Sequence, residues 1–87
     1  MEEYFVFKPS AFKHGIAEAD ILRAFEQRLY DYAMSDEEYK YLLLGLARDG
    51  GLLEIMYNVL DDDCINVFHA MKCRKAYLAL LRTRGIE

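Results

Sequence analysis

Two apolar runs, Leu52-Leu-Glu-Ile-Met-Tyr-Asn-Val-Leu60 and Cys64-Ile-Asn-Val-Phe-His-Ala70, flank the polar segment Asp61-Asp-Asp63 and decide the fold of this chain. Runs rich in β-branched and aromatic residues on either side of a short polar segment are typical of paired β-strands. We therefore expect strands over Leu52–Leu60 and Cys64–Ala70 with a turn between them. They must be antiparallel, because a parallel pair needs a connection of about a dozen residues or more.

The segments that precede this hairpin extend the same sheet. Leu29–Met34 and Tyr39–Leu46 also have strand character, with a turn at Ser35–Glu38 between them and a break at Arg48–Gly51 after them. The four strands follow one another through short connections, so we predict a four-stranded antiparallel sheet.

Helical periodicity appears on both sides of the predicted sheet. An apolar stripe predicts a helix over Ile16–Arg28, and a brief helix over Ala11–His14 that ends at Gly15 precedes it. From Cys73 onward the helical period returns and predicts a C-terminal helix. The stripes consist of Ala17, Ile21, Ala24 and Phe25 in the first helix, and Cys73, Tyr77, Leu80 and Leu81 in the last. The predicted fold class is α+β, with the helices packed on one face of the sheet.

The composition limits the size and location of this fold. The chain has 87 residues, of which 54% are hydrophobic, which supports one domain over residues 1–87 and excludes disorder. A chain of this size has a small core, so the sequence is compatible with either a monomer or an oligomer. The start of the chain lacks the features of a secretory signal, and no apolar run approaches the length of a membrane span. We expect a cytoplasmic protein with no membrane association.

Most motifs for metal, cofactor or nucleophile chemistry are absent. The spacing Cys64-x4-His69-x3-Cys73 has ligand types that suit zinc but lacks a fourth ligand, so we expect no metal site. The glycines fit neither phosphate-binding motif, and no serine or threonine has a nucleophile signature. We therefore expect no cofactor.

Glu54 is an unusual residue because it interrupts an otherwise apolar strand. If the turn at Asp61–Asp63 centres the hairpin, Glu54 lies opposite His69 or Ala70. A carboxylate and an imidazole in this arrangement can share a proton near neutral pH. The alternative, which we favour about two to one, is that Glu54 lies on the solvent face of a half-exposed strand.

The charges are segregated along the chain. The net charge of −4 combines six basic and fourteen acidic residues up to Asp63 with five basic and one acidic residue after it. A set of cations and imidazoles gathers around the predicted end of the sheet, and such a set suits binding a phosphodiester and stabilising charge during its cleavage. The set consists of Lys13, His14, His69, Lys72, Arg74 and Lys75.

Several segments resemble the BrnT family of type II toxins. They are Lys13-His14-Gly15-Ile16 with Ile21, Ala24 and Phe25 after it, Leu42–Gly45, Leu52–Tyr57, and Ile65–Ala76 with its Arg74-Lys75 pair. The resemblance spans about residues 5–81, with the segments in the family's order. It departs from the family at Tyr39-Lys40, where an acidic–arginine pair is usual, and at Leu52, where an arginine often stands.

This resemblance implies a RelE-like fold and a metal-independent endoribonuclease that a cognate antitoxin neutralises. It carries the family's cationic positions onto Lys13 and Arg74 and its imidazole onto His14, and Glu54 and His69 are further candidates for proton transfer. Lys72 and Lys75 are candidates for RNA binding. The alternative is a non-catalytic protein-interaction module on the same scaffold, because a fold does not fix a function.

Overall fold

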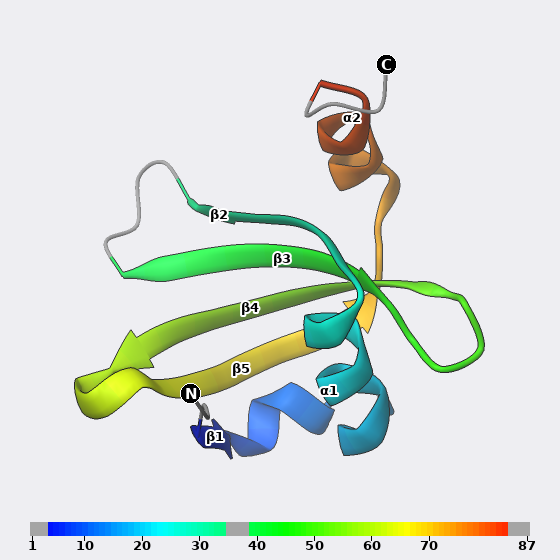
Figure 1. Cartoon of the computed structure of the whole chain (residues 1–87). Helices are drawn as coiled ribbons and strands as arrows, with labels where there is room; N and C mark the ends of the chain where they lie inside the picture. Colours follow the sequence, from blue (N-terminus) through cyan, green and yellow to red (C-terminus); the bar gives the residue numbers. More distant parts are fainter. Residues whose placement is uncertain (1–3, 35–38, 84–87) are drawn as a thin grey trace.

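The computed structural model describes residues 4–34 and 39–83, which form an α+β fold around one five-stranded sheet (Figure 1). The strand order across the sheet is β1-β5-β4-β3-β2. In chain order the elements are β1 (Tyr4–Phe7), the 3-10 helix η1 (Pro9–Phe12), α1 (Glu18–Glu26), β2 (Arg28–Ala33), β3 (Lys40–Leu46), β4 (Leu52–Leu60), the 3-10 turn η2 (Asp61–Asp63), β5 (Cys64–Lys72) and α2 (Lys75–Thr83).

The four predicted strands are confirmed as the antiparallel ribbon β2-β3-β4-β5, but the prediction of an all-antiparallel, four-stranded sheet is wrong. A fifth strand, β1, pairs in parallel with β5, with Phe5 beside Ile65 and Phe7 beside Val67. Parallel pairing is possible here because most of the chain lies between the two strands. The predicted turn at 35–38 lies outside the described residues.

The main apolar core lies between the sheet and α1. Ile21, Ala24 and Phe25 of α1 are buried against the strands, as the helical stripe predicts, and Leu43 and Ile55 face them from the sheet. The helix approaches β3 so closely that a Cβ on Gly45 would overlap the carbonyl oxygen of Ala24. Glycine at position 45 therefore sets the distance between α1 and the sheet.

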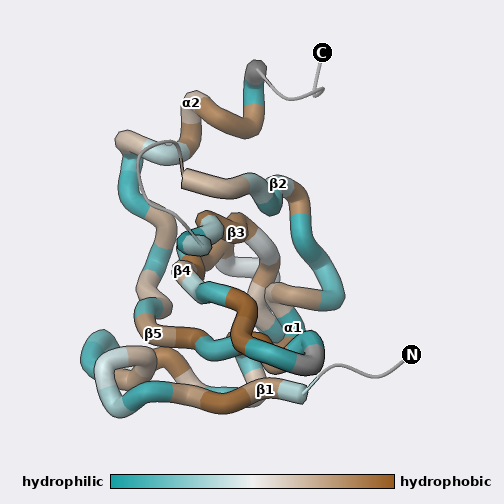
Figure 2. Tube along the Cα trace, turned by 90° about the vertical axis from the view of Figure 1, so that its left-hand side faces the viewer, coloured by the Kyte–Doolittle hydropathy of each residue, from teal (hydrophilic) through white to brown (hydrophobic). Residues whose placement is uncertain are grey.

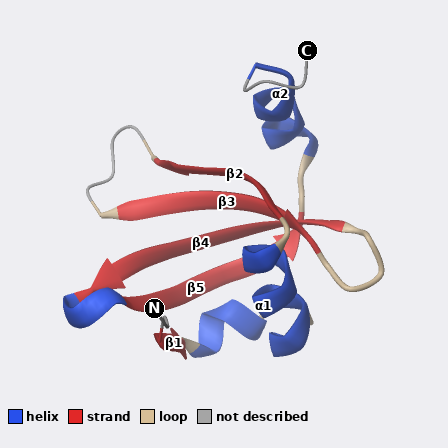
Figure 3. Cartoon of the chain, in the orientation of Figure 1, coloured by secondary structure: helices blue, strands red, loops and turns tan. Residues whose placement is uncertain are grey.

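The two α-helices lie on opposite sides of the sheet, so the prediction that they share one face is wrong. Figure 2 shows α1 inside the curve of the sheet and α2 outside it, beyond β2. In Figure 3, with helices in blue and strands in red, α2 lies beyond the outer strand β2 and α1 lies toward the β1 side of the sheet. The cause is the link after β5, where the backbone N–H of Arg74 bonds to a side chain on the face opposite α1. This second face carries the candidate site.

The helix boundaries differ modestly from the predicted ones. The brief helix before Gly15 is a 3-10 helix that starts earlier, at Pro9. Gly15 itself has the left-handed φ of 81° that a chain reversal favours. Helix α1 is shorter than Ile16–Arg28, because Ala17 is still extended and Arg28 already begins β2. No helix within residues 4–34 and 39–83 has the length and apolar character to cross a bilayer.

Candidate functional site

Glu54 is a charged residue that is fully buried in the sheet, with 0% of its surface exposed. Its chain neighbours Leu53 and Ile55 point into the core beneath α1. Since side chains alternate along a strand, Glu54 points to the opposite face. The favoured interpretation, a solvent-exposed Glu54, is therefore wrong. A buried carboxylate needs partners, and this one has several.

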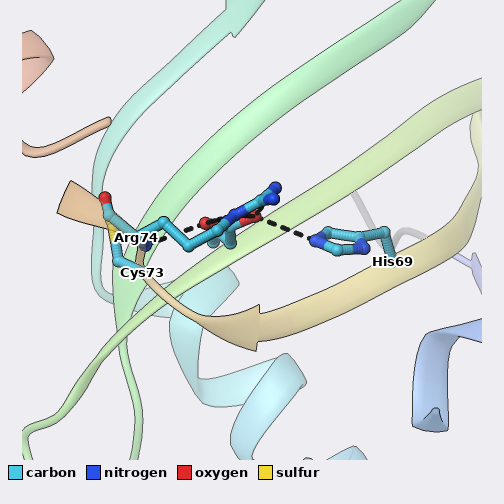
Figure 4. Close-up of polar contacts among 4 residues, drawn as sticks. His69, Cys73 and Arg74 are labelled. Carbon is cyan, nitrogen blue, oxygen red and sulfur yellow. Dashed lines mark hydrogen bonds and ion pairs between the residues drawn. The ribbon is translucent and has the colours of Figure 1, made fainter. Parts of the chain in front are cut away.

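Donors from two residues, His69 and Arg74, converge on the Glu54 carboxylate; Figure 4 labels these two residues and marks the bonds with dashed lines. Arg74 donates to it from its backbone N–H (2.9 Å to Oε1), from Nε (3.1 Å to each oxygen) and from Nη2 (2.6 Å to Oε2). The imidazole Nε2 of His69 lies 2.9 Å from Oε2. A guanidinium that binds both oxygens of one carboxylate fixes its own orientation as well as its charge.

These contacts decide the protonation of the group. Burial on its own would raise the pKa of Glu54, but the hydrogen bonds from Arg74 and His69 outweigh it and hold the pKa below its usual value. Glu54 is therefore an acceptor at neutral pH, so Nε2 of His69 must carry the proton that lies between them. Nδ1 of a neutral His69 is then left as the nitrogen that can accept a proton.

A β-bulge brings His69 to this face. The predicted pairing of Glu54 with His69 or Ala70 is off by one or two residues: Glu54 pairs with Met71, and His69 lies diagonally opposite. The register shifts where Tyr57 pairs with Val67, which leaves Phe68 as the extra residue in β5. Bulges commonly redirect side chains next to functional sites. Here the bulge puts His69 on the Glu54 face while Ala70 stays in the core.

The segment after β1 adds a second imidazole. The ring of His14 makes an edge contact with the ring of His69, with 5.6 Å between the centroids. The Ser10 hydroxyl holds this segment against β5 by donating to the carbonyl of Phe68 at 2.6 Å, instead of capping a helix. Lys13, the chain neighbour of His14, is exposed and makes no ion pair with any described residue.

The cluster opens to solvent on the Arg74 side. The Arg74 side chain is 52% exposed and that of His69 is 20% exposed, above a fully buried Glu54. Within the described part of the chain, Nη1 of Arg74 has no hydrogen-bond partner. The Tyr77 ring lies 5.6 Å from the guanidinium carbon, a contact that the sequence analysis missed although the i, i+3 spacing could have indicated it.

The structure thus brings together Glu54, His69, Arg74 and His14, and Lys13 directly precedes His14 in the chain. It does not bring the two predicted RNA-binding lysines into contact with this group. Lys72 lines a separate hollow on the α1 side, and Lys75 is exposed at the start of α2.

The cysteines do not belong to a metal-binding group. Within residues 4–34 and 39–83, no three His, Cys, Asp or Glu side chains are arranged to hold a metal ion. Cys64 and Cys73 are both free thiols, and burial together with the charge of Glu54 raises the pKa of Cys73.

In comparisons with known proteins, no family model matches the chain and no curated protein sequence matches it.

Proposed function

We propose that this chain is a metal-independent endoribonuclease, a BrnT-type toxin with a RelE-like fold that a cognate antitoxin neutralises in the cytoplasm. The observation that supports the proposal best is His69, which a buried carboxylate orients beside an arginine and a second imidazole. Imidazoles can accept and donate protons near neutral pH, and an arginine can stabilise a negatively charged phosphorane.

The proposed reaction needs no metal or external cofactor. His69 Nδ1 takes the proton of an RNA 2′-hydroxyl, whose oxygen forms a bond to the adjacent phosphorus. The bond from phosphorus to the 5′-oxygen breaks, and a protonated His14 gives its proton to that oxygen. The products are a 2′,3′-cyclic phosphate and a 5′-hydroxyl, so atoms and charges balance.

In this proposal the charged residues orient His69 and bind the phosphate. Glu54 holds the tautomer of His69 and stabilises the imidazolium that forms, as a carboxylate does for other catalytic histidines. Because Glu54 already neutralises Arg74, the phosphate is held by the Nη1 end of that guanidinium and by Lys13. In this proposal the acidic residues elsewhere in the chain bind a basic segment of the antitoxin and do not contact RNA.

The alternative is a non-catalytic interaction module on this scaffold. This alternative is supported by the bonds between Arg74 and Glu54. The backbone N–H, Nε and Nη2 of Arg74 all donate to the Glu54 carboxylate, which leaves few donors for a substrate. An ion pair of this kind needs no substrate to explain it. The two functions differ in what they require of the imidazoles, since only a nuclease needs their protons.

Induced expression in a bacterium separates the two. We expect growth arrest by the wild-type chain, with new 5′-hydroxyl RNA ends, and normal growth with His69→Ala or His14→Ala. Arg23→Ala is the control, because it removes an exposed side chain on α1, across the sheet from Glu54. Equal growth of cells with the wild-type and His69→Ala chains, at equal amounts of folded protein, would contradict the nuclease and support the interaction module.

A further inference from the structure

A second surface lies at the other end of β4 and β5, away from Glu54. Tyr39, Val59 and Leu60 are 74%, 43% and 47% exposed, and they line one hollow together with Asn58, Asp61 and Cys64. Contiguous apolar surface of this kind on a small domain commonly marks an interaction site.

The backbone around this hollow is held in unfavourable conformations. Tyr39 has φ 66° and Asp63 has φ 63°. A left-handed conformation is unfavourable for a bulky residue, and such strain often accompanies function. Tyr39 thus presents its ring to solvent at a cost to the fold. Asp61 lines the hollow and Asp63 follows two residues later; both are exposed and make no ion pair with any residue that the structure describes.

Helix α2 carries a surface with the opposite charge. Lys75, Leu78 and Arg82 are spaced i, i+3 and i+7, so they share one helix face, and all three are exposed. Leu78 is 42% exposed between the two cations. Neither cation pairs with an acid among the described residues, and Lys75 at the helix N-terminus is disfavoured by the helix dipole.

We propose that this cationic face of α2 docks into the acidic hollow of a second copy of the chain. Leu78 would lie against Tyr39 and Leu60, with Lys75 and Arg82 directed at Asp61 and Asp63. Within one chain the two surfaces are at opposite ends of the molecule, as Figure 1 shows, so the contact is between copies. The two surfaces have complementary charges, and each presents exposed apolar side chains to the other.

Charge reversal tests this association. The helix variant is Lys75→Glu with Arg82→Glu; the hollow variant is Asp61→Lys with Asp63→Asn, since asparagine tolerates the left-handed φ. Sedimentation velocity from micromolar to submillimolar concentration should show self-association of the wild type that weakens with salt. Each variant alone should weaken it by at least about tenfold, because like charges then meet. An equal mixture of the two variants should associate again, because opposite charges meet in every contact.

Controls keep the result specific. Lys8→Glu with Arg23→Glu changes the net charge as much as the helix variant does, at exposed residues outside both surfaces, and should associate like the wild type. Circular dichroism must show every variant folded. A wild-type chain that stays monomeric overturns the proposal, as does association that both variants leave unchanged or that the mixture does not restore.

Discussion

Two arginine–carboxylate pairs in this chain share one bonding pattern but lie in different surroundings. Arg48 donates to Asp20 through its backbone N–H, Nε and Nη2, as Arg74 does to Glu54. The Asp20 side chain is 24% exposed and Arg48 is 61% exposed, whereas Glu54 is fully buried and also contacts His69. The two pairs have the same donors, so the burial of Glu54 and its contact with His69, and not the number of hydrogen bonds, distinguish the candidate site from an ion pair that fixes a loop.

The largest difference in stability between the two pairs should appear when the arginine of each pair is replaced by alanine. Arg74→Ala leaves a buried carboxylate without its cation, so we expect the larger loss in the free energy of unfolding for this variant. Arg48→Ala leaves a carboxylate that water can reach, so the free energy of unfolding should change little. Urea unfolding of both variants measures this, and losses of equal size would contradict the distinction.

The second-largest effect should come from removing the negative charge of Glu54 while keeping the size of its side chain. Glu54→Gln keeps the shape but adds an amide N–H₂ that competes with the donors of Arg74 and His69, so we expect about 1–3 kcal/mol of destabilisation. Asp20→Asn is the matched change at the exposed pair and should cost less. The nuclease proposal adds that Glu54→Gln loses RNA cleavage while Asp20→Asn keeps it. Cleavage should be measured where both variants are folded.

Both carboxylates should make stability depend on pH in the same direction. The pKa of Glu54 is lowered from its ordinary value of 4.5, and that of Asp20 is lowered from 3.8 by its bonds from Arg48. Each ion pair therefore stabilises the fold above the ordinary pKa, and this stability is lost as the pH falls through the lower, folded-state pKa. We expect Glu54→Gln and Asp20→Asn each to flatten the fall in unfolding free energy below about pH 5. A profile that a variant leaves unchanged would contradict the stabilising role of that carboxylate.

The smallest effect should be local. Asp20 holds the segment that follows β3, because it accepts the backbone N–H of Arg48 at 3.0 Å. Asp20→Ala should speed amide hydrogen exchange at residues 47–51 and leave β4 and β5 protected. Faster exchange in β5 would show that the exposed pair also supports the Glu54 site.

Much of the fold was predictable from local patterns. The four antiparallel strands and the buried stripe of α1 follow from apolar periodicity. Strand β1 was missed because it has only four residues and its partner lies about sixty residues away. Its alternation of exposed Tyr4 and Val6 with inward Phe5 and Phe7 was visible, but a run this short does not reveal a parallel partner.

The site was only partly predictable. An isolated carboxylate in an apolar strand drew attention to Glu54, yet sequence alone favoured exposure because the face that α2 and Arg74 approach could not be known. The bulge at Phe68 changes which residues face Glu54, and nothing in the residue pattern encodes it. The contact of His14 with His69 depends on Ser10 fixing a loop to β5, which is a tertiary effect.

The central claim is that His69, oriented by Glu54, removes the proton of an RNA 2′-hydroxyl. The most direct measurement incubates the purified chain, in the presence of EDTA, with a DNA oligonucleotide that contains one ribonucleotide, and identifies the products by mass spectrometry. We predict cleavage after that ribonucleotide only, with a 2′,3′-cyclic phosphate, and no cleavage by a folded His69→Ala variant. An intact substrate with the wild-type chain, or equal cleavage by His69→Ala, would contradict the account.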